Sequence, residues 1–162
     1  MDKEPPVTND DDHPGVAVRP PVLYGSAVLV GAALEFWGAR LPLLADDAWR
    51  WAGTVMITAG VGLALVCVLG FRRAGTNVEP WRPATALVLG GPYRFSRNPI
   101  YVGLTLTYAG IAVAADSLWM VTLLVPVLAV MQSGVVRREE AYLERTFGDD
   151  YRAYKARVRR WL

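Results

Sequence analysis

The sequence predicts an all-α integral membrane protein: a bundle of about four transmembrane helices, followed by amphipathic C-terminal helices on the cytoplasmic side. Three observations lead to this fold class. Hydrophobic residues make up 53% of the 162 residues, and the mean hydropathy of +0.25 is high for a soluble domain of this size. The apolar residues fall into long runs, and a helix of about 20 apolar residues crosses the hydrocarbon core of a bilayer. The basic residues gather in alternate connections between those runs.

Four apolar runs make up the predicted bundle. We expect them to span the membrane at about residues 21–44, 52–71, 98–115 and 118–136. The last three runs carry no charged residue, and the third begins with Asn98 and Pro99. Proline suits the first turn of a helix, because its missing N–H needs no partner there. The first run contains Glu35 and Arg40. An acid inside a span is a candidate functional residue, or it pairs with Arg40 near the outer surface, and the sequence leaves both interpretations open.

The basic residues predict the orientation of the bundle. All of the 17 Lys and Arg residues except Arg40 and Arg50 lie before the first run, between the second and third runs, or after the fourth. Connections rich in Lys and Arg stay on the cytoplasmic side of a membrane. Both termini and the connection 72–98 are therefore expected to face the cytoplasm, and we expect the membrane to be a bacterial cytoplasmic membrane.

The segments outside the runs divide the chain further. Residues 1–20 are rich in Asp, Pro and Asn, a composition typical of a disordered tail, and residues 21–162 form a single membrane domain. A short outer loop at residues 41–51 places Trp49 and Trp51 as interfacial anchors. The cytoplasmic connection 72–98 is long for so small a protein, and such loops are usually functional. No metal site is expected.

The C-terminal region, residues 137–162, is predicted to form amphipathic helices broken near Gly148, since glycine favours a helix stop. Its apolar and aromatic residues recur at steps of three or four: Leu143, Phe147, Tyr151, Tyr154, Val158 and Trp161. This spacing forms one stripe along a helix. The stripe lies on the bilayer surface or folds back over the connection 72–98, and the sequence favours neither.

Two polar clusters stand at the ends of the predicted hairpin of the third and fourth runs. In the first, Gly91–Tyr101, a Gly-Pro turn leads into the third span, and Tyr93, Arg97 and Tyr101 share one helix face at a spacing of four. Arginines that hold a connection on the cytoplasmic side would explain Arg94, but they would not explain these tyrosines. We therefore expect the block to be functional. The second cluster places Glu139 and Glu140 directly after two arginines. It forms a helix-surface salt bridge or a site for a zwitterionic or cationic ligand.

These clusters together resemble the integral membrane methyltransferases related to isoprenylcysteine carboxyl methyltransferase and phospholipid N-methyltransferase. The shared pattern is Gly-Pro-Tyr-Arg-x-x-Arg-(His/Asn)-Pro-x-Tyr, a hairpin, and then Arg-x-Glu-Glu-x-x-Leu-x-x-x-Phe-Gly-x-x-Tyr-x-x-Tyr. Here the two parts lie at residues 91–101 and 137–154. Gly75, Thr76, Pro80 and Thr85 also match the loop of this family, and the resemblance covers roughly residues 50–162.

The resemblance implies methyl transfer from S-adenosylmethionine to a lipophilic or small acceptor (a carboxylate, a thiol or an amine) at the cytoplasmic face. It implies the catalytic residues Arg97, Asn98, Tyr101 and Glu140. It further implies cofactor contacts from Gly60, Gly62, Tyr93, Arg97, Asn98, Pro99, Tyr101, Glu139, Glu140, Tyr151 and Tyr154. Gly60 and Gly62 correspond to a Gly-x-Gly of the phospholipid enzymes, although small residues in a span also allow close helix packing. Many relatives carry histidine at the position of Asn98, and asparagine has no titratable group.

Two other functions are compatible with the pattern. A membrane reductase of the sterol-reductase type, which uses NADPH, shares a similar arginine–proline–tyrosine block, and a membrane adaptor without activity would need no substrate at all. The expected partner is a membrane lipid or a lipophilic small molecule. Nucleic acid is not expected, because the basic residues flank spans and no nucleic-acid motif is present. The sequence leaves the acceptor and the oligomeric state open.

Overall fold

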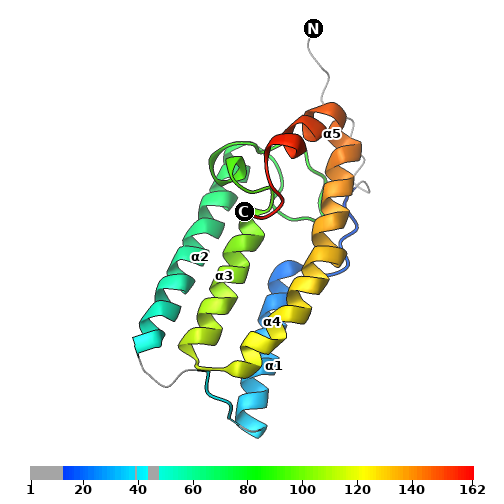
Figure 1. Ribbon diagram of the computed structural model, residues 1–162. Coiled ribbons are helices and arrows are strands. Elements are labelled where there is room, and N and C mark those ends of the chain that lie inside the picture. Colours follow the sequence, from blue (N-terminus) through cyan, green and yellow to red (C-terminus); the bar gives the residue numbers. More distant parts are fainter. Residues whose placement is uncertain (1–12, 39, 44–47) are drawn as a thin grey trace.

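The computed structural model describes residues 13–38, 40–43 and 48–162 and is all-helical, with no strand within these residues (Figure 1). Its elements are α1 (Pro20–Trp37), α2 (Ala48–Arg73), the 3-10 helix η1 (Gly91–Arg94), α3 (Pro99–Ala114), α4 (Leu118–Val130), the π-helix η2 (Met131–Val136) and α5 (Arg137–Arg157). The helices α4, η2 and α5 follow one another without a break. This arrangement confirms the predicted all-α bundle.

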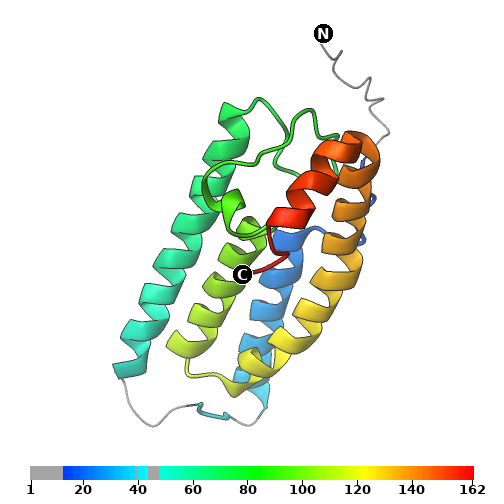
Figure 2. The ribbon, with the colours of Figure 1, turned by 45° about the horizontal axis from the view of Figure 1, so that its top comes forward.

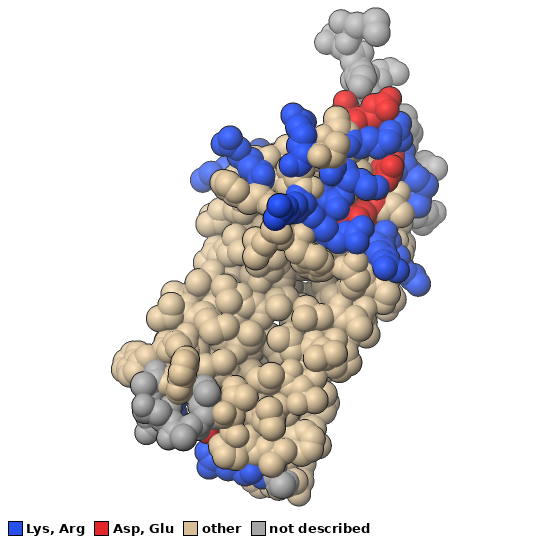
Figure 3. Space-filling model, viewed as in Figure 1, with Lys and Arg blue, Asp and Glu red and all other residues tan. Residues whose placement is uncertain are grey.

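Three helical stretches are long and apolar enough to cross a membrane: Pro20–Trp37, Trp49–Arg73 and Leu118–Arg157. The fourth expected span, Pro99–Ala114, is apolar but has only 16 residues. Large apolar side chains such as Leu29, Val55 and Val125 point outward along the helices. On the face shown in Figure 3, the middle of the molecule carries no charge, and most charges gather over α5 and the adjacent loops. We call this charged end the polar end, and we take residues 118–136 as the membrane part of the long helix.

The helices α2 and α3 lie in backbone contact, because glycines of the two helices face each other. A Cβ added to Gly60 would lie 2.6 Å from the carbonyl oxygen of Gly103, and one added to Gly53 would lie 2.7 Å from that of Gly110. Small residues at such positions let transmembrane helices approach closely. This contact holds the start of α3, and with it the polar block, against the middle of α2.

The other half of the bundle is held by buried hydroxyl groups. Tyr24 of α1 and Thr105 of α3 share a 2.7 Å hydrogen bond, and Tyr108 of α3 donates to the carbonyl of Met120 in α4. At the opposite end from α5, Ser117 caps α4 and donates to Glu35 at 2.7 Å. Glu35 therefore ties α1 to the α3–α4 turn.

Residues just before α1 lie along the π-helix. Gly134 offers its carbonyl to the backbone N–H of Ala17 at 2.9 Å, and Arg138 donates to the carbonyl of Gly15 at 2.8 Å. The sequence predicted a disordered tail up to residue 20, but residues 15–17 are held by these bonds. Residues 1–12 of that predicted tail lie outside the described residues.

Several predicted boundaries need correction. The first predicted span runs to about residue 44, whereas the helix within it ends at Trp37, where Gly38 caps it. The second helix begins earlier than expected, so that Trp49 and Trp51 are exposed side chains on its first turns. The predicted break near Gly148 is confirmed by its φ of 52°. The helix prediction up to residue 162 is wrong from Val158 onward, because α5 ends at Arg157 and residues 158–162 are not helical.

Candidate functional site

The candidate site lies at the polar end, where the block 91–101 faces α5 across a short distance. Gly91, at φ +60°, and Pro92 turn the chain into η1, and Pro99 starts α3. The kink at Gly148 folds the second part of α5 back over this block, so the aromatic stripe covers the loop instead of lying along the bilayer (Figure 2). Tyr154 seals the contact by donating a 2.8 Å hydrogen bond to the carbonyl of Tyr93.

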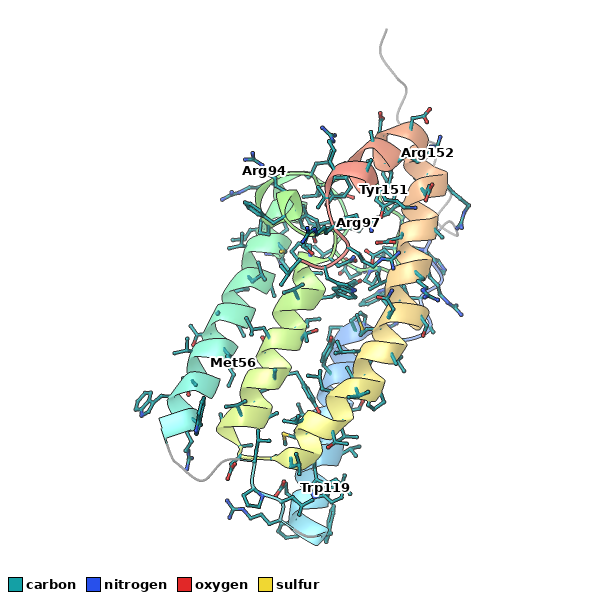
Figure 4. All side chains as sticks on the ribbon, viewed as in Figure 1. Met56, Arg94, Arg97, Trp119, Tyr151 and Arg152 are labelled. Carbon is teal, nitrogen blue, oxygen red and sulfur yellow. The ribbon has the colours of Figure 1, made fainter. Side chains whose placement is uncertain are left out.

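A cavity with about 60 Å³ of free volume lies between these elements and the connection that follows α2. Eight of the predicted site residues line it: Tyr93, Arg97, Asn98, Tyr101, Glu139, Glu140, Tyr151 and Tyr154. Figure 4 shows Arg97 and Tyr151 in the space between the block and α5, whereas Arg94 points outward. The fold therefore brings together residues that are up to 61 positions apart in the chain.

Glu140 is a buried carboxylate with two arginine partners. It is 5% exposed. Arg160 donates from Nη2 to Oε2 at 2.8 Å and from Nε to Oε1 at 3.1 Å, and Arg97 Nη2 lies 3.5 Å from Oε1. Two cations thus surround this one carboxylate.

Glu139, the adjacent carboxylate, has a different environment. It accepts a 2.7 Å hydrogen bond from the hydroxyl of Tyr101, and no ion pair to it occurs in the described part of the chain. Burial raises the pKa of Glu139 to about 7, and the nearby Glu140 adds to this effect, whereas the bond from Tyr101 acts in the opposite direction. Glu139 therefore changes its charge near neutral pH.

Arg97 carries unused hydrogen-bond donors. Its side chain is only 9% exposed, and neither Nε nor Nη1 has a partner, although both are buried. A buried, unpaired guanidinium N–H is costly, and guanidinium groups favour carboxylate or phosphate oxygens. Arg97, which lines the cavity, thus has two unpaired nitrogen donors of the kind that an acidic group of a ligand would satisfy.

Asn98 and Tyr151 complete the lining in different ways. The side-chain amide of Asn98 donates to the carbonyl of Arg160 at 3.0 Å, and its backbone N–H donates to Ser96. Asn98 therefore holds the C-terminal residues in place. Burial raises the pKa of Tyr151 well above its usual range, so its hydroxyl stays protonated and lines the cavity as a neutral group.

Three predicted site residues do not line the cavity. Gly60 faces α3 and serves helix packing, and an added Cβ on Gly62 would meet nothing within 4 Å. Pro99 is buried as a first-turn residue of α3. The structure thus separates the Gly-x-Gly pair from the eight lining residues.

Two residues of the site were missed by sequence reasoning. Arg160 binds Glu140. In the sequence it is one of many basic residues near the C-terminus, and such residues indicate only the orientation of the bundle in the membrane. Tyr142 accepts a 3.1 Å hydrogen bond from the backbone N–H of Ala84, and it lines the cavity. Its place two residues after Glu140 was the available signal. Within the residues that the structure describes, no group of His, Cys, Asp and Glu could hold a metal ion.

An apolar groove of about 670 Å³ lies between α3 and α4, on the membrane side of the site. It is lined by Val102, Thr105, Leu106, Ala109, Leu128, Ala129, Gln132, Trp161 and Leu162. Its polar members are few, and the side-chain oxygen of Gln132 is buried without a partner. Thr105 lies one helical turn beyond Tyr101 along α3, so the groove and the cavity follow the same helix.

Comparisons with known proteins identify similar chains. A family model described as phospholipid methyltransferase matches residues 48–150. The nickel-cobalt-cadmium resistance protein NccN of Alcaligenes xylosoxydans xylosoxydans is 29% identical over 108 residues, which cover 65% of this chain and 49% of that protein. An uncharacterised protein of Haemophilus influenzae is 54% identical over 35 residues, 22% of this chain and 56% of that protein. The chain thus spans about half the length of these curated relatives.

Proposed function

The chain belongs to the phospholipid methyltransferase family, within the wider group of integral membrane methyltransferases, and from this premise we propose that it transfers a methyl group from S-adenosylmethionine to a lipophilic acceptor. The observation that carries the proposal is the pairing of opposite charges in one cavity. The free donors of Arg97 lie beside the carboxylates of Glu139 and Glu140.

The residues present fit this cofactor. S-adenosylmethionine has a carboxylate and an ammonium at its amino-acid end, next to a positive sulfonium. Arg97 has two N–H donors for the carboxylate, and Glu139 and Glu140 supply negative charge for the cationic groups. The phenol rings of Tyr93, Tyr151 and Tyr154 add faces that attract cations. When bound, the cofactor supplies a methyl group on sulfur that is open to in-line displacement by a nucleophile.

The chain's own residues would act mainly by alignment and by excluding water. A carboxylate or thiolate acceptor needs little help from a base. An amine acceptor must lose a proton, and for this step we favour Glu139 over Glu140. Glu140 is engaged by ion pairs with Arg97 and Arg160, whereas burial raises the pKa of Glu139 to about 7, close to the value that suits a general base.

The groove between α3 and α4 supports a lipophilic acceptor. Its lining is largely apolar, and it lies among helices whose outer faces meet lipid. A hydrocarbon chain placed there would bring an attached polar group toward Tyr101, at the cofactor cavity. We further propose that the site and both termini face the cytoplasm of a bacterial cell, because nearly all basic residues lie at the polar end.

Calorimetry of the detergent-solubilised full chain tests the proposal, with S-adenosylmethionine and NADPH as separate titrants. We expect binding of S-adenosylmethionine and none of NADPH. Binding of NADPH alone would favour a reductase, and binding of neither would favour an adaptor. Transfer of a labelled methyl group to a membrane lipid extract would then identify the acceptor class by analysis of the labelled product.

A further inference from the structure

The last residues of the chain form a non-helical strap, Val158–Leu162, that returns from the end of α5 to the start of α3 (Figures 1 and 2). The carbonyl of Arg159 accepts a 2.9 Å hydrogen bond from the backbone N–H of Arg97. The carbonyl of Arg160 accepts a 3.0 Å hydrogen bond from Asn98. The strap is therefore bound to two of the residues that line the cofactor cavity.

The side chain of Arg160 is the strap's strongest contact with the site. Both Nε and Nη2 donate to the carboxylate of Glu140, at distances from 2.8 to 3.2 Å. This paired geometry is among the strong forms of charge-assisted hydrogen bond. Arg160 is thus a cation supplied by the chain itself to a carboxylate at which we place the cofactor's positive end.

The strap also reaches the acceptor side. Trp161 and Leu162 line the apolar groove between α3 and α4, and Trp161 packs against the buried core. The five residues thus contact the cofactor cavity through Arg160 and the groove through their two apolar members. A change in the strap's position would alter both at once.

The small free volume of the cavity also supports a movement of residues when a ligand binds. The free volume there is about 60 Å³, whereas pockets for ligands of the size of a cofactor hold roughly 300–1,000 Å³. Part of the lining must therefore move when such a ligand binds. The strap is not itself part of the lining, but it holds Arg97, Asn98 and Glu140, which are, so its displacement would let these three residues move.

We propose that Arg160 and the ammonium of S-adenosylmethionine compete for Glu140, so that cofactor binding displaces the strap and opens the groove toward the cavity. This inference rests on the proposed function for the identity of the cofactor. The strap would then compete with the cofactor for Glu140, and its displacement would couple the cofactor cavity to the apolar groove between α3 and α4.

Titration of Arg160→Gln with S-adenosylmethionine tests the competition, with Arg159→Gln as the matched control. Both variants lose one positive charge at the same place in the chain, but the exposed Arg159 uses only its backbone carbonyl in the strap. We expect Arg160→Gln to bind the cofactor roughly tenfold more tightly, because a carboxylate left with Arg97 as its remaining partner attracts a cation more strongly, and Arg159→Gln to match the wild type. Equal or weaker binding by Arg160→Gln would overturn the inference, since Arg160 would then serve to hold Glu140 in place.

Hydrogen exchange of the Arg97 backbone amide, which donates to the carbonyl of Arg159, supplies a second readout. Addition of S-adenosylmethionine to the wild type should speed exchange of this amide, and Glu140→Gln should do so without any cofactor. An Arg97 amide that stays protected while the cofactor binds contradicts the inference alone. No cofactor binding by the wild type or by Arg160→Gln contradicts the proposed function and the inference together.

Discussion

The hydroxyl of Tyr101 at the start of α3 donates a 2.7 Å hydrogen bond to the carboxylate of Glu139 on α5. This bond joins the two polar clusters that stand almost forty positions apart, and it involves the carboxylate that has no arginine partner among the described residues. Burial, the Tyr101 hydroxyl and the nearby Glu140 together set the pKa of Glu139, and the bond from Tyr101 is the most direct of these to test.

Tyr101→Phe should move the pH dependence of cofactor binding to higher pH. In the wild type, affinity for the cationic cofactor should rise as pH increases through about 7, because Glu139 becomes charged there. The bond from Tyr101 lowers the pKa of Glu139, so its loss should shift the midpoint upward. Calorimetric titrations across neutral pH measure the midpoint. An unchanged midpoint would show that Glu139 does not contact the cofactor's charge.

Glu139→Gln should flatten the pH dependence of stability. The pKa of Glu139 is raised from 4.5 to about 7 in the folded chain, so between these values the folded state binds more protons than the unfolded state. Its contribution to stability is therefore complete below pH 4.5 and is lost as pH rises through 7. The unfolding temperature of the wild type should fall over this interval relative to that of the variant. Glu144→Gln is the control, because the bond from Lys155 lowers the pKa of Glu144, which places its effect below the interval.

Arg97→Ala should abolish most of the cofactor affinity, whereas Arg94→Ala should leave it unchanged. Both arginines belong to the same short block, but Arg94 is exposed and Arg97 is buried beside Glu140. Loss of a buried charge partner costs about 2 kcal/mol or more, which is at least about a 30-fold loss of affinity. Calorimetry gives the affinities, and thermal unfolding of each variant verifies that the fold is kept. Equal losses in the two variants would remove Arg97 from the cofactor site.

Gly60→Ala and Gly62→Ala separate packing from cofactor contact. The added methyl of Gly60→Ala would meet backbone atoms of α3 at 2.6 and 2.7 Å, whereas that of Gly62→Ala would meet nothing within 4 Å. Overpacking typically costs about 1–3 kcal/mol, so only Gly60→Ala should lower the unfolding temperature. Cofactor affinity of the folded fractions provides the other measurement. A weakened affinity in Gly62→Ala, with stability kept, would support the cofactor contact that the resemblance implies.

Much of the fold could be predicted because helix periodicity and charge position are local signals. The uncharged runs located α2, α3 and α4, and Gly148 marked the kink in α5. Contacts between helices are not local signals. Gly60 had two readings in the sequence, and only the approach of α3 to its backbone decides that it packs a helix.

The site was predictable to the extent that its residues form spaced clusters. The two clusters contain Arg97, Tyr101, Glu139 and Glu140, all of which line one cavity. The strap was not predictable, because the apolar spacing of the preceding helix continues through Val158 to Trp161. Hydrogen bonds from Arg97 and Asn98 to the backbone of the strap replace those of a further helical turn.

The π-helix at Met131–Val136 sets the rotational phase between the membrane half and the polar half of one continuous helix. Each residue of an α-helix rotates the chain by about 100° around the helix axis. One residue more or fewer in this segment would therefore rotate every side chain of α5 around that axis by a similar angle. Glu139 and Glu140 face the cavity only in the present phase. The π-helix therefore fixes the direction in which the two carboxylates point. The number of residues between the fourth apolar run and the glutamate pair can vary little without turning them away from the cavity.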